Sequence, residues 1–309
     1  ESESSGKLNT IRMRIPMEKL GNHFLPIPPR EEQKQIVDFL DKKTTQIEKL
    51  IKKIEQKIEL LKEQKTSLIN EVVTKGLNPN VEMKYSDVEW IGEIPKHYVS
   101  VKLRWIIDSI KDGTHGTHPS SDDGKILLSG KNVQDGFLNI NDSERRIPLE
   151  EHEKIIKNGY PKEGDVLVSS VGSIGRSCVF EYPEPISFQR SVCFIRPSFK
   201  LNSYYLSYLI RSNVCQNQIT TLINQSTVGG IYMGDLTNLS VITPPREEQE
   251  QIVEYLDGNY IKNFNKNKEL EFSTMIYKIR YGINDNEVKL IPKNPQKKGF
   301  FEKFFQLFG

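Results

Sequence analysis

The spacing of apolar residues predicts a long helix near the start of the chain. From Leu40 to Val72, positions alternately three and four residues apart are apolar except at Thr44 and Lys65, and Lys and Glu fill most other positions. This is the heptad pattern of a coiled coil, sustained over more than four heptads. Because little apolar surface lies outside this seam, we expect the helix to pair with another helix rather than to enter a globular core. The predicted seam residues are Leu40, Ile47, Ile51, Ile54, Ile58, Leu61, Leu68 and Val72.

Both ends of this helix carry recognisable signals. Prolines 28–29 disfavour helix before them and suit a first turn, and glutamates 31–32 complement the positive end of the helix dipole. Gly76 is suited to a C-terminal cap, and Pro79 follows it. We therefore expect a coiled-coil helix within residues 28–78.

An internal repeat organises the rest of the chain. The segment LPIPPREEQKQIVDFLD at residues 25–41 recurs as VITPPREEQEQIVEYLD at residues 241–257, which is 216 residues further on. The second copy soon meets Gly258 and an asparagine-rich stretch, so we expect a shorter or broken second helix at residues 246–285. Two arrangements are open: an antiparallel pair within one chain, or pairing across a homodimer.

The segment between the helices predicts an α+β domain at residues 79–245. Short β-rich runs such as KILLSG, GDVLVSSVG and VCFIRP are separated by turn residues. Amphipathic patterns predict a helix at residues 203–223 and a short one at 148–155. The run VGSIGR at residues 171–176 lacks the ending of a nucleotide-binding loop, so a tight turn between strands is expected.

Charge and cysteine content narrow the functional classes. The 309 residues contain 43 Lys and Arg against 41 Asp and Glu, so a general electrostatic attraction to nucleic acid is not supported, and any basic DNA-binding face must be local. Cys178, Cys193 and Cys215 lie far apart, which predicts buried thiols in a reducing cytoplasm. No stretch approaches the roughly 18 apolar residues of a membrane span, so we expect a cytoplasmic protein without a membrane partner.

The loop KDGTHGTHP, which begins at Lys111, concentrates hydrogen-bonding side chains. It predicts contacts to DNA bases or phosphates. A structural turn and a metal site of Asp112, His115 and His118 are the alternatives, although the metal site would lack further ligands nearby. Other polar and basic residues are either DNA contacts or solvated surface groups. The DNA-binding candidates are Lys111, Thr114, His115, Thr117, His118, Arg145, Arg146, Ser173, Arg176, Gln189 and Arg190.

Three segments in order carry a family resemblance: WIGEIPKHY at residues 90–98, GDVLVS followed by VGSIG at 164–175, and the closing PPREEQ. The chain resembles the specificity subunits of type I restriction-modification systems. The resemblance implies a globular target-recognition domain, flanked by two long helices that form an antiparallel coiled coil. It also implies double-stranded DNA and the methyltransferase and restriction subunits as partners. No catalytic residue is expected in this chain, and S-adenosylmethionine, ATP and Mg²⁺ are expected on the partner subunits.

The chain departs from the usual family pattern of two recognition domains. It contains one complete domain, and residues 1–27 are interpreted as the end of another. A homodimer, an inactive or recombination-donor fragment, and a coiled-coil adaptor that never binds DNA are therefore alternatives. The basic and aromatic tail at residues 286–309 suits either a partner-docking or membrane-surface helix or a disordered or sequence-shifted end.

Overall fold

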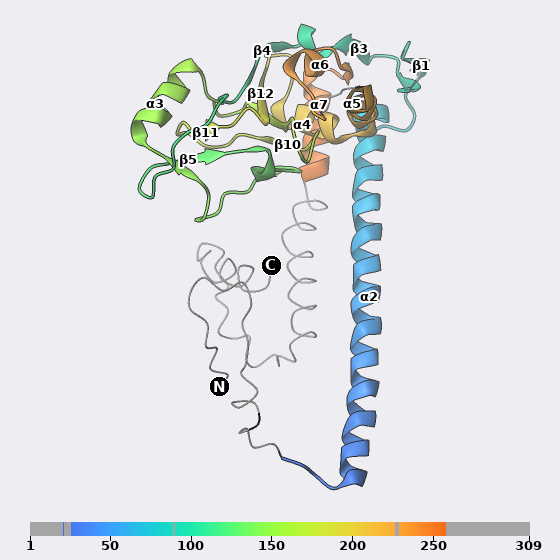
Figure 1. Cartoon of the computed structure of the whole chain (residues 1–309). Helices are drawn as coiled ribbons and strands as arrows, with labels where there is room; N and C mark the ends of the chain where they lie inside the picture. The colour runs from blue at the N-terminus through green and yellow to red at the C-terminus, as the bar shows by residue number, and fades with distance from the viewer. Residues whose placement is uncertain (1–20, 22–25, 89, 226–228, 258–309) are drawn as a thin grey trace. The chain divides into compact units, whose positions relative to one another are not determined.

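A computed structural model describes residues 21, 26–88, 90–225 and 229–257. The chain forms two compact units, residues 1–55 and 56–309. The described parts comprise one long helix and a domain of mixed strands and helices, which confirms the α+β class (Figure 1). The predicted remnant before residue 26, the second helix beyond residue 257 and the tail at 286–309 lie outside the described residues.

Helix α2 runs from Arg30 to Lys75 and has 46 residues. It ends at Gly76, whose φ of 74° lies in the left-handed region and whose N–H donates to the Val72 carbonyl at 2.9 Å. The last turns differ from the sequence expectation, because Val72 is buried in the domain core and Leu68 packs against it. The reason is local: Ile69 and Val73 widen the apolar stripe beyond the seam, and both are buried in the same core.

A four-stranded antiparallel sheet forms the centre of the domain, in the order β10-β9-β12-β4. The alternation of side chains along β9 explains why both faces are covered. Val166 and Val168 join the large core beneath α4 and α5, whereas Leu167 joins a second core with Phe188 and Phe194. The strands are β4 (Ile107–Asp112), β9 (Val166–Ser169), β10 (Ser177–Val179) and β12 (Val192–Pro197), and the helices are α4 (Ser203–Arg211) and α5 (Asn213–Gln225).

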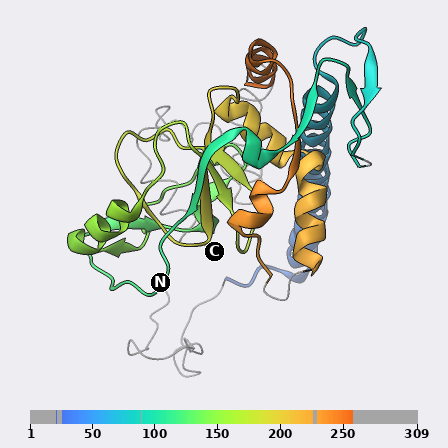
Figure 2. The same cartoon turned by 90° about the horizontal axis from the view of Figure 1, so that it is seen from above.

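Smaller sheets and helices surround this centre. Figures 1 and 2 both place α3 on the side of the domain opposite to the β1–β2 hairpin. The β-elements are β1 (Met83–Tyr85) with β2 (Glu93–Pro95), β3 (Val99–Lys102) with β13 (Ser240–Thr243), β5 (Lys125–Leu128) between β11 (Ser187–Phe188) and β8 (Arg146–Ile147), and β6 (Val133–Gln134) with β7 (Phe137–Leu138). The helices are η1 (Leu103–Trp105), η2 (Gly130–Asn132), α3 (Leu149–Asn158), α6 (Met233–Thr237) and α7 (Arg246–Leu256).

The helix predicted at residues 203–223 is two helices. Ser212 interrupts it with an extended conformation, ψ 160°, and its hydroxyl donates to the Leu209 carbonyl at 2.6 Å. The Asn70 side chain of α2 then accepts from the Asn213 N–H at 2.7 Å, so a group distant in sequence satisfies the first donor of α5. The periodicity continued across the break, which is why the sequence pattern did not reveal it.

The three cysteines are free and buried, as predicted. Burial raises the pKa of each thiol to about 12. Within the described residues, no helix combines the length and apolar character needed to cross a membrane.

Candidate nucleic-acid interface

Three loops meet at one edge of the central sheet. The register pairs Asp112, the last residue of β4, with Cys193, and Ser169, the last residue of β9, with Val192. The carboxyl ends of β4 and β9 therefore lie beside the start of β12. The loops that leave or enter these ends, at residues 113–119, 170–176 and 189–191, contain eight of the eleven predicted DNA-binding residues.

Main-chain hydrogen bonds fasten the first loop to the turn before β12. The Thr114 N–H donates to the Phe188 carbonyl at 2.7 Å, and the Arg190 N–H donates to the Thr114 carbonyl at 2.9 Å. A Cβ at Gly113 would lie 2.2 Å from the Phe188 oxygen, so only glycine permits this approach. Two segments more than 70 residues apart thus present Thr114, Gln189 and Arg190 together.

The two histidines of the first loop, His115 and His118, have different partners. His115 Nε2 lies 2.7 Å from Asp112 Oδ2, and the His115 side chain is largely exposed. His118 is mostly buried; its Nε2 lies 3.1 Å from the Thr114 hydroxyl and its Nδ1 lies 3.3 Å from Glu151 Oε2 on α3. Among the residues that the structure describes, no cluster of three or more potential metal ligands is present.

Helix α3 supports the first loop from outside the sheet. Lys111 Nζ donates to the Asn158 carbonyl at 3.2 Å, and the Arg145 guanidinium donates to the His118 carbonyl. Hydrogen bonds from Lys154 and then from His118 lower the pKa of Glu151, which keeps that carboxylate charged. His152 packs inward, with Nδ1 2.8 Å from the Ser187 hydroxyl, and burial lowers its pKa, which favours the neutral ring.

The second loop is the β9–β10 turn, as predicted for residues 171–176. Gly172 and Gly175 both have positive φ and leave Ser173 exposed at the tip. Arg176 is partly buried, and its guanidinium donates to Gln134 Oε1 at 2.7 Å. Because one side of Arg176 is engaged within the fold, Ser173 is the more accessible of the two candidates.

Contacts between the loops make them one surface. The Ser170 N–H donates to the Ser191 carbonyl at 2.9 Å, and the Ser170 hydroxyl donates to the Arg190 carbonyl at 3.2 Å. Within the described part of the chain, the side chains of Thr117, Ser173 and Arg190 are exposed and make no hydrogen bond or ion pair. These groups can therefore meet an acceptor from outside, and an exposed guanidinium suits a phosphate or a guanine edge.

The remaining candidates mainly hold the edge together. Arg146 donates to the Gly124 carbonyl at 3.0 Å, and the Gln189 N–H donates to the Leu128 carbonyl at 2.8 Å. Lys111 and Arg145 are exposed, but Lys111 bonds to the end of α3 and Arg145 bonds to the main chain of the first loop. The candidates therefore fall into two groups: those that face solvent with no bond to another described residue, and those that hold the loops in position.

Sequence reasoning missed Tyr232. The Ile231 N–H donates to the Ser170 carbonyl at 3.0 Å, and Gly230 forms a bridge with Val171, which draws this segment to the second loop. Tyr232 is 52% exposed there, so an aromatic side chain borders the edge. Nothing in the local sequence distinguishes it from a buried tyrosine; only the non-local bridge reveals its position.

Comparison with known proteins identifies the domain. Residues 122–272 match the "Type I restriction modification DNA specificity domain". The chain is 30% identical over 261 residues to the type I restriction enzyme MjaVIII specificity subunit of Methanocaldococcus jannaschii, covering 80% of this chain and 58% of that one. Residues 122–272 belong to the family of type I restriction-modification DNA specificity domains. The matched range includes the second loop and the turn before β12, but it begins after the first loop.

Further relatives place the specificity domain in the same group. The EcoBI specificity subunit of Escherichia coli is 26% identical over 242 residues, covering 76% of this chain and 51% of that protein. A chain from "Structural basis underlying complex assembly and conformational transition of the type I R-M system" has a TM-score of 0.61 at 18% identity, covering 89% of this chain and 63% of that one. This structural similarity supports the fold of the chain. The chain spans little more than half the length of these two curated relatives.

Proposed function

We propose that this chain is the DNA-recognition component of a type I restriction-modification complex and that its domain reads one half of a bipartite site in double-stranded DNA. The carrying observation is the convergence of three loops at one edge of the central sheet, where the exposed side chains of Thr117, Ser173 and Arg190 make no hydrogen bond or ion pair with any other described residue. Phosphate contacts would position the edge, and base contacts from the loops would provide the sequence preference.

The long helices would connect recognition to the catalytic partners. We propose that α2 pairs, through its seam from Leu40 to Leu61, with the helix predicted at residues 246–285, either antiparallel within the chain or across a homodimer. Such a pair would fix the separation of half-sites and bind methyltransferase and restriction subunits. S-adenosylmethionine, ATP and Mg²⁺ would then act on those subunits, and this chain would perform no chemistry itself.

The direct test is methylation of a random DNA library by the chain co-purified with its modification subunits. A split motif in the sequenced products would support two recognition domains, supplied by a dimer. A single short motif would support recognition by one domain. No methylation, although the complex assembles, would contradict DNA reading and favour an adaptor or an inactive fragment.

A matched pair of variants tests the sheet edge itself. Arg190→Ala should weaken binding to the selected duplex by about 1–3 kcal/mol if Arg190 contacts a base. If it contacts a phosphate, all sequences should weaken alike and the salt dependence should become shallower. Lys200→Ala is the control, because it removes the same charge beyond the opposite end of β12. Equal losses of DNA affinity in both variants would contradict a DNA-binding surface confined to the three loops.

A further inference from the structure

Strand β3 has one edge that no described strand covers. It pairs with β13 alone, with Lys102 opposite Ser240 and Ser100 opposite Ile242. The other edge of β13 is closed, since the Gln218 side chain accepts from the Ser240 N–H and donates to the Ser240 carbonyl, both at 2.8 Å. The question is which main-chain groups of β3 point to the open side.

The register answers this question. The Leu103 N–H donates to the Leu239 carbonyl at 2.9 Å, so this pair is hydrogen-bonded, and pairs alternate along antiparallel strands. Ser240 and Ile242 must then direct their main-chain groups away from β3. Their contacts agree, because Ser240 bonds to Gln218 and the Ile242 carbonyl accepts from the Tyr205 hydroxyl at 3.0 Å. By the same alternation, Ser100 directs its N–H and C=O away from β13, and Lys102 does so with its N–H. The Lys102 carbonyl is already used, because Lys102 is the N-cap of η1 and its C=O accepts the first bond of that helix.

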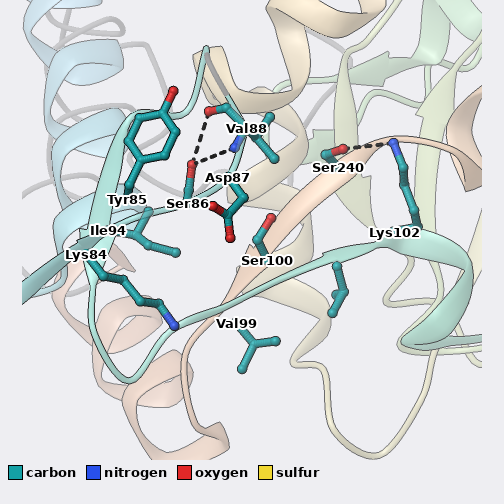
Figure 3. A pocket seen from close by; sticks show the side chains of 11 residues that line it. Lys84, Tyr85, Ser86, Asp87, Val88, Ile94, Val99, Ser100, Lys102 and Ser240 are labelled. Carbon is teal, nitrogen blue, oxygen red and sulfur yellow. Dashed lines mark hydrogen bonds between the residues drawn. The ribbon is translucent and has the colours of Figure 1, made fainter.

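These groups face a hollow of about 440 Å³ between β3 and the β1–β2 hairpin (Figure 3). Lys84 and Asp87 of the hairpin side project toward β3, and Lys102 lies at the other end, with its Nζ donating to the Ser240 hydroxyl at 2.8 Å. Asp87 has a φ of 60°, the one positive φ of a non-glycine residue in the described part of the chain. Two lysines against one aspartate leave the lining positive.

A second hollow adjoins the first at Lys102, which lines both. It has about 310 Å³ and is more apolar, with Trp90, Leu222 and Leu239 in its lining. Trp90 is 54% exposed, so part of its ring is available to a partner. An open strand edge, a positive lining and an apolar hollow therefore follow one another on the β1–β2 side of the domain.

We propose that this edge binds an extended, acidic segment of a partner protein, which adds to β3 as a further strand. The main chain of the segment would bond to Ser100 and Lys102, an Asp or Glu side chain would meet Lys84 and Lys102, and an apolar side chain would enter the hollow beside Trp90. A strand is favoured over a helix because the outward groups, the Ser100 N–H and C=O and the Lys102 N–H, are main-chain groups spaced two residues apart, as in a strand. The proposal does not rest on DNA reading, since α3, which contacts the first candidate loop, lies on the side of the domain opposite to the β1–β2 hairpin (Figures 1 and 2).

Selection of random eight-residue peptides, displayed and panned on the immobilised full chain, tests the proposal. We expect enrichment of peptides that carry Asp or Glu between apolar residues. Binding of such a peptide should slow amide hydrogen exchange at Ser100 and Lys102 at least tenfold, while Val101, already bonded to β13, should change little. Lys84→Glu should lower the affinity for the selected peptide at least tenfold.

Ser100→Pro removes one outward donor, and proline is tolerated on an edge strand. The Ser100→Pro variant should no longer bind the selected peptide, whereas Ser100→Ala should still bind it. If Ser100→Pro fails to fold, the exchange measurement and Lys84→Glu decide. The proposal is overturned if no peptide is enriched, if the selected peptides are basic, if exchange at Ser100 and Lys102 is unchanged on binding, or if a DNA duplex displaces the peptide from this edge.

Discussion

The two copies of the repeated segment, at residues 25–41 and 241–257, differ in how far their side chains are buried. In both, the glutamine of PPREEQ donates its side-chain amide to the carbonyl of the first proline, at 2.7 Å from Gln33 and 2.9 Å from Gln249. Both helices therefore begin in the same way. Beyond this point the copies diverge, because Ile36 is 42% exposed, whereas its counterpart Ile252 is fully buried.

The specificity domain causes this difference, because it contacts the second copy. Around the second copy, Gln249 also accepts from the Asn202 N–H at 2.8 Å and donates to the Lys200 carbonyl at 3.0 Å. The carboxylate of Glu248 accepts from the Tyr98 hydroxyl at 2.8 Å. Nearly identical sequences thus share a local structure but not a packing environment, so the same substitution should have different effects at the two copies.

The largest contrast is expected for the isoleucines. Ile252→Ala should lower the free energy of unfolding by about 2–5 kcal/mol, because it opens a cavity in a fully buried site. Ile36→Ala should cost at most about 0.5 kcal/mol. Urea denaturation of the two variants measures both values. Equal losses would show that Ile36 is also covered in solution.

Substitutions of the two glutamines, Gln249 and Gln33, should differ somewhat less in the free energy of unfolding that they remove. Gln249→Ala leaves the Asn202 N–H and the Lys200 carbonyl without this partner in a partly buried setting, and the Pro244 carbonyl in a buried one. A loss of about 2–3 kcal/mol is therefore expected. Gln33→Ala removes one exposed bond and should cost below about 1 kcal/mol. Melting temperatures of both variants, with Gln249→Glu as a near-isosteric comparison, would reveal the contrast.

This comparison also shows how far the sequence predicts the structure. Helix starts and ends, such as those at Pro29 and Gly76, depend on neighbouring residues and were predictable. The contacts of the second copy were not, because Tyr98, Lys200 and Asn202 approach Glu248 and Gln249 only in the folded domain. The candidate interface divides in the same way: its polar loops were visible in the sequence, but the bonds that bring Thr114 beside Arg190 are non-local.

Tyr98 provides a further contrast between the two copies, because it bonds to Glu248 of the second copy. Tyr98→Phe should cost about 1 kcal/mol at neutral pH through the lost hydrogen bond. Burial, and then the bond to Glu248, raise the pKa of Tyr98 well above its usual range. The buried phenol therefore favours folding fully below the unfolded pKa of about 10, and this contribution falls as the pH rises above it. Unfolding at pH 8 and pH 10.5 should show a smaller alkaline loss in Tyr98→Phe than in the parent chain.

The smallest expected effect concerns a charge that differs between the copies. Arg246 Nε lies 2.8 Å from Glu250 Oε1, one helical turn along, and both side chains are largely exposed. The first copy has Lys34 in place of that glutamate, so Arg30 faces a like charge. Lys34→Glu should stabilise the start of α2 by about 0.3–0.5 kcal/mol, and Glu250→Lys should weaken α7 by a similar amount. Hydrogen exchange of the second helical turn, at low and high salt, can resolve such changes. An effect that salt does not reduce would mean that side-chain packing, rather than charge, distinguishes the two helix starts.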